Sequence, residues 1–337
     1  MDDLIRRSIQ TVESNARSEV PWQSDVPSEQ PVHKWDAREA VWKASTASHT
    51  KASESDASSS FEPLTLFSWN IDFMLPFPTS RMRAAFRHLQ TLVQAQPTTT
   101  AIIIHLAECV ASDLNFLASD PWVRATFLIT DLSTADWESG YYGTTTLIDR
   151  RLPVQSVFRV QYSQTRMARD ALFVDVVLGN STLRLCNTHL ESLANTPALR
   201  PPQMQLCARY MHASPTNAAI LAGDLNAIQP FDADLPVDNG LKDAYLQTGG
   251  DVDAGHTWGQ QATTAMRERF GTTRMDKVLY CGDVICTSFA LFGAGIELDD
   301  AAEREAVVML GFEKPWITDH LGVMATVEME GGVQASL

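Results

Sequence analysis

The stretch LCNTHLES, residues 185–192, joins an apolar strand pattern to a histidine and a glutamate. Over residues 182–187 the chain reads TLRLCN, in which Leu183 and Leu185 alternate with polar neighbours, the period-two pattern of a half-buried β-strand. The imidazole of His189 therefore falls where a predicted strand ends. A single histidine in such a place is more often a structural hydrogen-bonding group than a catalyst, so its role depends on which polar residues accompany it.

The composition is that of an acidic globular protein. Hydrophobic residues make up 45% of the 337 residues and charged residues 20%, and the formal net charge is −15. Such a charge argues against indiscriminate binding to nucleic acid, which relies on Lys and Arg neutralising phosphates, but it allows a local basic groove. The five cysteines form no C-x-x-C pair, so we expect reduced thiols, no structural disulfide and no zinc site.

The N-terminus and the hydropathy pattern favour an intracellular protein. MDDLIRRSIQ, residues 1–10, lacks the apolar stretch of a signal peptide, and no run of about 18 apolar residues is present. We expect a nuclear or cytoplasmic location and no membrane association.

A change in composition predicts the domain boundaries. Residues 44–60 consist largely of Ser, Ala and charged residues, so residues 1–60 are predicted to form a flexible Ser-rich arm. Residues 61–330 alternate short apolar runs with helical patterns and are predicted to form one catalytic domain. Residues 331–337 are then a C-terminal tail.

Many strands and two helices are predicted within this domain. A stripe through Met82, Phe86 and Leu89 predicts a helix over residues 80–95, and another helix follows Pro202. This alternation favours an α/β fold, a sandwich of two packed sheets with helices outside. The predicted strands are 64–69, 101–107, 123–129, 143–148, 157–162, 171–178, 182–187, 218–222, 275–280 and 321–328.

Polar residues gather at the ends of these predicted strands. Six motifs supply them, namely WNID, HLAE, THLES, GDLN, RMDK and ITDH. Each motif alone is typical of a turn or a cap, but together they bring carboxylates, amides and imidazoles to strand termini. The residues concerned are Asn70, Asp72, Glu108, His189, Asp224, Asn226, Asp276, Asp319 and His320.

This set of residue types suits the hydrolysis of a phosphate ester. Glu108, helped by Asp72 or Asp319, can hold one Mg²⁺ through hard oxygen ligands, while Asp224 can orient or deprotonate the attacking water. Asp276 is a sensible partner for His320, because a paired Asp raises an imidazole pKa and fixes its tautomer. Four side chains can donate to the charge that builds on the phosphoryl oxygens: Asn70, His189, Asn226 and His320.

In this order across residues 64–328, the motifs resemble the metal-dependent endonuclease/exonuclease/phosphatase superfamily of deoxyribonuclease I and exonuclease III. The resemblance implies a four-layer α/β/β/α sandwich of two packed mixed β-sheets, with a single Mg²⁺ or Mn²⁺ at one edge. It also implies a role for each matching residue: Glu108 as metal ligand with Asp319 near the metal, Asn70 as a phosphate and metal-shell amide, Asp224 and Asn226 in water activation and transition-state support, and Asp276 orienting His320 on the phosphate.

Within the superfamily the chain most resembles the tyrosyl-DNA phosphodiesterase 2 family. The shared features are WNID, THLES, a helix start with Arg200, the Thr-Trp pair at Trp258 and SGYYG around Tyr141. The abasic-site endonuclease branch generally carries Asn where His189 stands. Ala107 and the AIQPFD segment after GDLN depart from the family pattern and bear on substrate preference more than on hydrolysis.

This resemblance implies a Mg²⁺-dependent 5′-tyrosyl-DNA phosphodiesterase, a monomer acting on a single-stranded, peptide-linked DNA 5′ end in the repair of topoisomerase–DNA adducts. Alternatives are an abasic-site endonuclease, an RNA or phospholipid or inositol-phosphate hydrolase, and a non-catalytic nucleic-acid-binding module. The loss of a site carboxylate would favour the non-catalytic module, but all are present. The expected substrate-binding residues are Tyr141, Arg166, Arg169, Ser192, Trp258 and Arg274.

Overall fold

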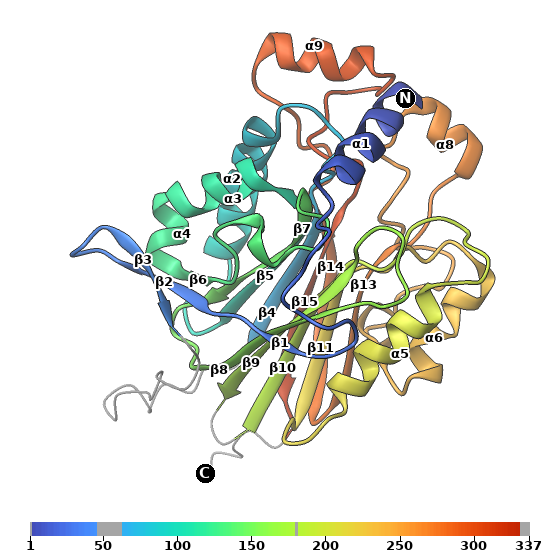
Figure 1. Cartoon of the computed structure of the whole chain (residues 1–337). Helices are drawn as coiled ribbons and strands as arrows, with labels where there is room; N and C mark the ends of the chain where they lie inside the picture. Colours follow the sequence, from blue (N-terminus) through green and yellow to red (C-terminus); the bar gives the residue numbers. More distant parts are fainter. Residues whose placement is uncertain (1, 46–62, 179–180, 331–337) are drawn as a thin grey trace.

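Two β-sheets pack face to face in the computed structural model, which describes residues 2–45, 63–178 and 181–330, and helices cover their outer faces (Figure 1). Both sheets are mixed, because β10 pairs with β11 and β4 with β5 in parallel among antiparallel neighbours. The seven-stranded sheet has the order β1 (Ser28–Glu29), β8 (Val154–Gln161), β9 (Asp170–Leu178), β10 (Ser181–Thr188), β11 (Ala218–Asp224), β13 (Asp276–Gly282) and β12 (Lys242–Asp243). The eight-stranded sheet has the order β14 (Val284–Phe292), β15 (Gly322–Met329), β4 (Leu64–Asn70), β5 (Ala101–Val110), β7 (Tyr142–Asp149), β6 (Phe127–Ile129), β2 (Val32–Asp36) and β3 (Val41–Ser45).

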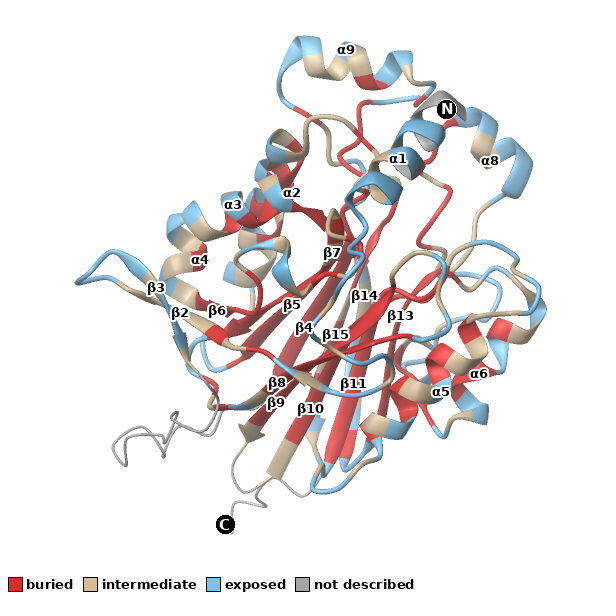
Figure 2. Ribbon diagram, in the orientation of Figure 1, coloured by how far each residue is buried: buried red, intermediate tan, exposed pale blue. Residues whose placement is uncertain are grey.

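Three apolar layers hold the sandwich together. Between the sheets, Leu66 and Ile103 of one sheet belong to the same buried cluster as Leu185 and Ile220 of the other. Separate clusters fill the space under the helices on each outer face, and the strands are accordingly buried along most of their length (Figure 2). The predicted four-layer α/β/β/α sandwich is therefore confirmed.

Helices of different length cover the two outer faces. Met82, Phe86 and Leu89 of the first long helix pack against the eight-stranded sheet, as the stripe predicted, and Met204 and Cys207 pack against the other. The helices are α1 (Asp2–Asn15), α2 (Pro78–Gln94), α3 (Ala111–Ser119), α4 (Pro121–Thr126), α5 (Arg200–Met211), α6 (Leu235–Asp238), α7 (Ala244–Gln247), α8 (Thr264–Phe270) and α9 (Ala301–Met309), with 3₁₀ turns η2 (Thr134–Asp136) and η3 (Pro230–Ala233).

The strand predicted over residues 123–129 is wrong in its first half, where α4 precedes the short β6. Asp120 caps this helix by accepting from the backbone N–H groups of Trp122 and Val123, and Pro121 fits the first turn. The cap and the proline thus favour a helix here more strongly than the apolar run favours a strand. Strand β14 was not predicted, since several of its residues are exposed at the edge of the sheet.

The N-terminal region also differs from the expected arm. β1 pairs with β8, and β2 pairs with β6, so residues 28–45 extend both sheets rather than forming a flexible arm. These short strands show little apolar alternation in sequence. Pairing with neighbouring strands stabilises them instead. The Ser-rich stretch 46–60 and the predicted tail 331–337 lie outside the described residues.

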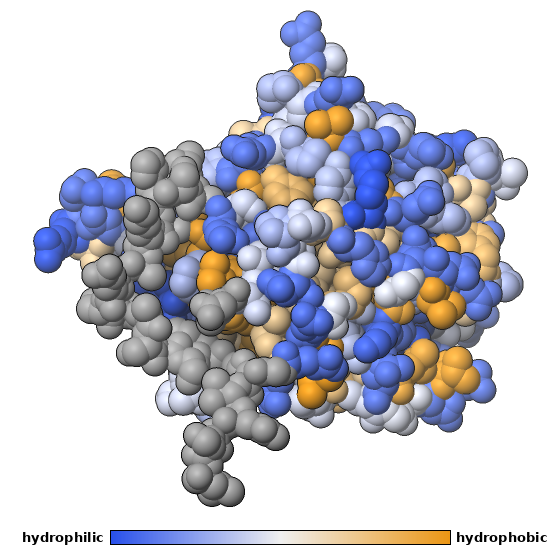
Figure 3. Space-filling model, turned by 90° about the horizontal axis from the view of Figure 1, so that it is seen from below, coloured by the Kyte–Doolittle hydropathy of each residue, from blue (hydrophilic) through white to orange (hydrophobic). Residues whose placement is uncertain are grey.

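The surface seen from below offers little continuous apolar area in the part that the grey residues leave visible (Figure 3). Where that face is coloured, hydrophilic residues predominate and the apolar patches are small and separate (Figure 3). In the described ranges, every helix is too short or too polar to cross a membrane.

Candidate active site

The predicted site residues come together at one edge of the sandwich. Asn70 ends β4 and Asp224 ends β11, while His189 directly follows β10. Because β4 pairs in parallel with β5, and β10 with β11, the carboxyl ends of each pair lie side by side. Glu108 of β5 and Asp276 of β13 complete the set, with all five residues at most 9% exposed.

One oxygen of Asp224 is the centre of this arrangement. Its Oδ2 accepts from Nδ2 of Asn70 at 3.0 Å and lies 3.2 Å from Nε2 of His189 and 3.7 Å from Nε2 of His320. The other oxygen, Oδ1, accepts from the backbone N–H of Asn226 at 2.9 Å. The carboxylate is thus fixed by main chain on one side and surrounded by nitrogen atoms on the other.

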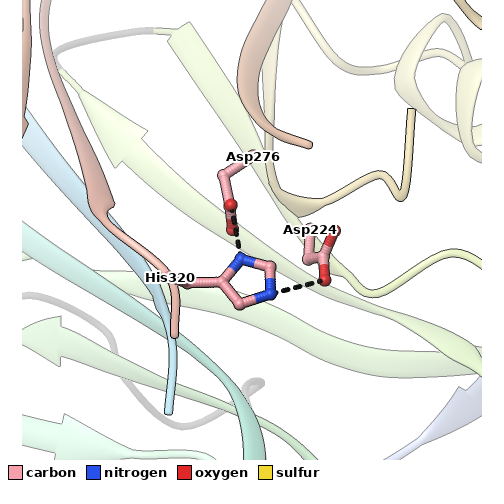
Figure 4. Close-up of side chains that lie close together, drawn as sticks. All are labelled: Asp224, Asp276 and His320. Atoms are coloured by element: carbon pink, nitrogen blue, oxygen red, sulfur yellow. Dashed lines mark hydrogen bonds and ion pairs between the residues drawn. The ribbon is translucent and has the colours of Figure 1, made fainter. Parts of the chain in front are cut away.

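Asp276 orients His320. Its Oδ2 accepts from Nδ1 of the imidazole at 2.7 Å, which directs Nε2 toward Asp224 (Figure 4). The hydroxyl of Thr257 accepts from the backbone N–H of Asp276 at 2.9 Å and so positions the start of β13. The predicted pairing of Asp276 with His320 is present in the geometry.

Charges in this group influence one another strongly. Burial alone would raise the pKa of Asp224, but His189 and His320 hold that pKa below its ordinary value. Burial would lower the pKa of His320, yet Asp276, Asp224 and Asp319 together raise it well above its ordinary value. These directions favour an ionised Asp224 and a doubly protonated His320.

Three further carboxylates lie beside this group, and they are the predicted metal ligands. In each of them an N–H donor holds one oxygen, while the second oxygen accepts no hydrogen bond within the described part of the chain. The donors are the backbone N–H of Phe73 to Glu108 Oε2 at 3.0 Å, the backbone N–H of Met74 to Asp72 Oδ1 at 2.9 Å, and Nε1 of Trp258 to Asp319 Oδ2 at 2.7 Å.

These carboxylates fit a hard divalent cation. Burial raises the pKa of Asp72 well above its ordinary value, and the neighbouring charges of Asp319 and Glu108 raise it further. Burial likewise raises the pKa of Asp319. Largely buried acids that repel one another, each with an oxygen that accepts no hydrogen bond in the described structure, are the donor set that Mg²⁺ or Mn²⁺ would neutralise.

The tightest group of metal-ligating side chains in the described residues is a different one. The ligand atoms of Asp224, Asp276 and His320 lie within 4.8 Å of one another. We do not assign the cation to this group, because a protonated His320 has no lone pair to offer and its Nδ1 already binds Asp276. Its atoms are better suited to hold water and phosphate.

Three of the site residues adopt left-handed backbone conformations. The φ angles are +58° at Asp72, +61° at Glu108 and +48° at Asn226. Glu108 lies in an irregularity of β5, where the pairing with β7 shifts between Leu106 and Cys109. Such irregularities re-aim a side chain, and here Glu108 turns toward the other acids.

His189 has a defined tautomer. Arg169, which is buried, donates from its Nη1 to Nδ1 of His189, so the ring proton lies on Nε2. That buried Nε2 lies near Asp224 but makes no aligned hydrogen bond in the described structure. It is therefore an available donor for a phosphoryl oxygen. Arg169 also donates to the hydroxyl of Ser192 at 3.3 Å and stands over the ring of Tyr142.

The other expected substrate-binding residues lie in different surroundings. Trp258 is 8% exposed and its indole holds Asp319, so it positions a carboxylate. Tyr141 is partly exposed and meets Phe73 edge-on, with ring centroids 6.1 Å apart. Arg166 is exposed. Arg274 donates to Asp243 at 2.7 Å and lies over Tyr245, so its described contacts are away from the acidic group.

Sequence reasoning missed two buried residues that shape the site. Arg81 of α2 donates to the backbone carbonyls of Ile71, Asp72 and Leu75 and to that of Ile317, near Asp319. Glu191, the acid of THLES, accepts from the hydroxyl of Thr165 at 2.7 Å. The stripe on α2 shows that position 81 neighbours the apolar face. The hydrogen bonds of Arg81 to main-chain carbonyls cannot be predicted from residue types, because every residue has a carbonyl.

The comparisons with known proteins agree with this geometry. A family model described as Endonuclease/Exonuclease/phosphatase family matches residues 67–320. A 5′-tyrosyl-DNA phosphodiesterase of Caenorhabditis briggsae is 26% identical over 235 residues, covering 68% of this chain and 63% of that protein. Tyrosyl-DNA phosphodiesterase 2 of Homo sapiens is 26% identical over 201 residues, covering 57% of this chain and 51% of that protein.

The chain thus spans less than two thirds of the length of either curated relative. Among solved structures, D. rerio TDP2 complexed with single-strand DNA product aligns with a TM-score of 0.60 at 20% identity, covering 80% of this chain and 100% of that one, which shows a common fold. With the match over residues 67–320, which is more than half of the sequence, the chain belongs to the Endonuclease/Exonuclease/phosphatase family.

Proposed function

We propose that this chain is a Mg²⁺-dependent phosphodiesterase that hydrolyses a phosphodiester at a DNA 5′ end, and specifically the bond between a 5′-phosphate and a tyrosine. The observation that carries the proposal is the convergence of Asn70, His189 and His320 on one oxygen of Asp224, beside the carboxylates of Glu108, Asp72 and Asp319. Removal of tyrosine from DNA would give the protein a part in the repair of topoisomerase–DNA adducts.

The roles of the residues follow from their contacts. A bound Mg²⁺ or Mn²⁺ would neutralise phosphate charge, and Asp72, Glu108 and Asp319 would hold it. Asp224 stays ionised and is fixed by Asn226, so it is suited to orient the attacking water in line with the leaving oxygen.

Hydrogen-bond donors would stabilise the transition state. Nε2 of His189 and Nε2 of His320 both point at the space beside Asp224, where charge on the phosphoryl oxygens would build. Asp276 keeps His320 protonated and oriented. Preorganised donors in a buried site are the largest source of rate enhancement in this class of reaction.

The choice of a tyrosyl–DNA substrate is supported by the curated relatives, whose names specify that activity. The exposed Arg166 and the partly exposed Tyr141 give a strand a cationic and an aromatic contact near the site. A net charge of −15 limits binding to such local contacts.

The test presents the protein and Mg²⁺ with oligonucleotides that carry a 5′-phosphotyrosine, an abasic site or a plain 3′ end, together with an RNA and an inositol phosphate. We expect selective release of tyrosine, leaving a 5′-phosphate, and loss of this activity when EDTA is added. Cleavage only at the abasic site would place the protein in that branch instead. Binding of the strand without any hydrolysis would favour a non-catalytic module.

A further inference from the structure

The N-terminal region contacts the two loops that carry candidate substrate-binding residues. We call residues 15–30 the N-terminal strap; in Figure 1 it is the blue chain that leads from α1 to β1 across the strands. The tyrosine loop, residues 134–141, ends in Tyr141. The arginine loop, residues 163–169, contains Arg166 and Arg169.

Arg17 fastens the strap to the tyrosine loop. Its guanidinium donates from Nε to the carbonyl of Trp137 at 3.0 Å and from Nη2 to the carbonyl of Thr134 at 2.9 Å. Its backbone N–H donates to the carbonyl of Glu138 at 3.2 Å. These bonds engage three carbonyl groups within five residues, immediately before Tyr141.

The N-terminal strap also passes very close to the tyrosine loop. Gly140 has a φ of +66°, and a Cβ built there would come within 2.3 Å of the carbonyl oxygen of Asn15. A residue with a side chain would therefore have to displace the strap. This close approach shows that the loop and the strap pack as one unit.

Asp25 fastens the other end of the strap to the arginine loop. Its Oδ1 accepts from the backbone N–H of Ser163 at 2.9 Å, and its Oδ2 accepts from the Ser163 hydroxyl. Its own backbone N–H donates to the carbonyl of Gln161 at 2.8 Å, while its carbonyl accepts from the hydroxyl of Tyr210 on α5 at 3.0 Å. Asp25 thus connects the loop to both a strand and a helix.

Both fastened loops present a side chain that a strand could contact. Tyr141 is partly exposed and meets Phe73 edge-on, and Arg166 is exposed. We propose that the N-terminal strap is a positioning element for substrate: it holds the two loops at the spacing that an extended, polyanionic strand requires. This inference rests on the proposed function for its substrate, whereas the mechanical link rests on the contacts alone.

The first experiment measures hydrogen exchange in the full chain for Arg17→Met and Asp25→Ala. We expect amide exchange about fivefold faster in residues 134–141 for the first variant and in residues 163–166 for the second. Asp36→Ala is the matched control, because Asp36 also accepts two backbone N–H groups in the N-terminal region but touches neither loop. Unchanged exchange in both loops would overturn the proposal.

The second experiment separates positioning from general destabilisation. Each variant should raise KM for a 5′-phosphotyrosyl oligonucleotide about tenfold, a loss of about 1.4 kcal/mol, with kcat and the activity on a small chromogenic diester unchanged. Asp25→Asn, which keeps an oxygen acceptor for Ser163, should restore KM. Equal losses on both substrates, or loosened loops with an unaltered KM, would contradict the role in substrate positioning.

The two proposals can fail separately. If the native chain hydrolyses no 5′-tyrosyl substrate, the proposed function is wrong. Fluorescence anisotropy with a single-stranded oligonucleotide then measures how the strap affects the affinity for a strand. Weaker binding by Arg17→Met and Asp25→Ala, but not by Asp36→Ala, would still support the strap. Equal binding by all three variants would contradict it.

Discussion

Nδ2 of Asn70, at the end of β4, lies 3.0 Å from Oδ2 of Asp224, at the end of β11. This hydrogen bond crosses from the eight-stranded sheet to the seven-stranded sheet. The carboxylate that would orient water belongs to one sheet, and Glu108 belongs to the other. The packing of the two sheets therefore sets the distance between Asp224, proposed to orient water, and Glu108, proposed to hold the metal.

The residues proposed to orient water and to bind phosphate should act mainly on turnover. Asp224→Asn and His320→Ala are each expected to lower kcat at least about 100-fold, the scale seen when a general base or one oxyanion donor is lost. KM should change much less, because neither Asp224 nor His320 is expected to bind the strand outside the scissile phosphate. Steady-state kinetics on the tyrosyl oligonucleotide measure both constants, and weaker binding with normal turnover would show that these residues only hold substrate.

The metal assignment is tested at Glu108. Glu108→Gln keeps the size of the side chain but removes its charge, so Mg²⁺-dependent activity should be abolished while the fold persists. Isothermal titration with Mg²⁺ and circular dichroism measure the two effects separately. Glu313→Gln, at an exposed ion pair with Arg267, is the matched control. Full activity of Glu108→Gln would exclude the single-metal arrangement assigned to these carboxylates.

The two arginines of the arginine loop should behave differently. Arg166 is exposed, so Arg166→Ala should raise KM for an oligonucleotide. It should also reduce, by about one unit, the steepness with which the logarithm of the binding constant falls with the logarithm of the salt concentration. Arg169 is buried against His189, so Arg169→Ala should lower kcat on the oligonucleotide and on a small chromogenic diester alike. Salt titrations of both variants make the comparison. If Arg166→Ala slows the small diester as well, the residue supports the fold and does not bind the strand.

A buried histidine should make the protein sensitive to acid. His105 lies in β5, where Nδ1 contacts the carbonyl of Ala222 and Nε2 has no hydrogen-bond partner in the described structure. Burial lowers the pKa of His105 from 6.5 to about 3. Between these values the unfolded chain binds a proton that the folded chain does not, so stability is lost as the pH falls from 6.5 toward 3.

The expected loss at this residue is about 2 kcal/mol in the free energy of unfolding between pH 8 and pH 5. His105→Gln, which can still donate to Ala222 but cannot titrate, should make the pH dependence shallower by that amount. Urea denaturation at both pH values measures it. His212→Gln, at an exposed histidine, is the control. An identical pH dependence in native protein and His105→Gln would show that folding does not lower the pKa of His105.

The site was predictable where local pattern and chemistry coincide. Asn70 and Asp224 each close an apolar run, so their place at a strand end could be read from the sequence, whereas Glu108 lies in an irregularity two residues before the end of β5. The parallel pairing of β4 with β5 and of β10 with β11 then brings those ends together, as the sandwich fold requires.

The other features of the site and the fold could not be predicted, because they depend on side chains distant in sequence or on main-chain groups, which are the same in every residue. Arg274 was expected at the substrate but pairs with Asp243, 31 positions earlier, and no local pattern indicates that pairing. Arg81 is saturated by main-chain carbonyls, which every residue has. The strands between residues 28 and 45 exist because β6 and β8 offer them open edges.

The left-handed backbone at Asp72 and Glu108 sets a limit on how this protein can be made more stable. A residue with a Cβ is strained there by roughly 1–2 kcal/mol, which glycine would relieve. Selection for thermal tolerance alone would therefore favour glycine at these positions and remove the acids with it. Searches for thermostable variants should hold both positions constant, because a gain in melting temperature there would remove two proposed metal ligands.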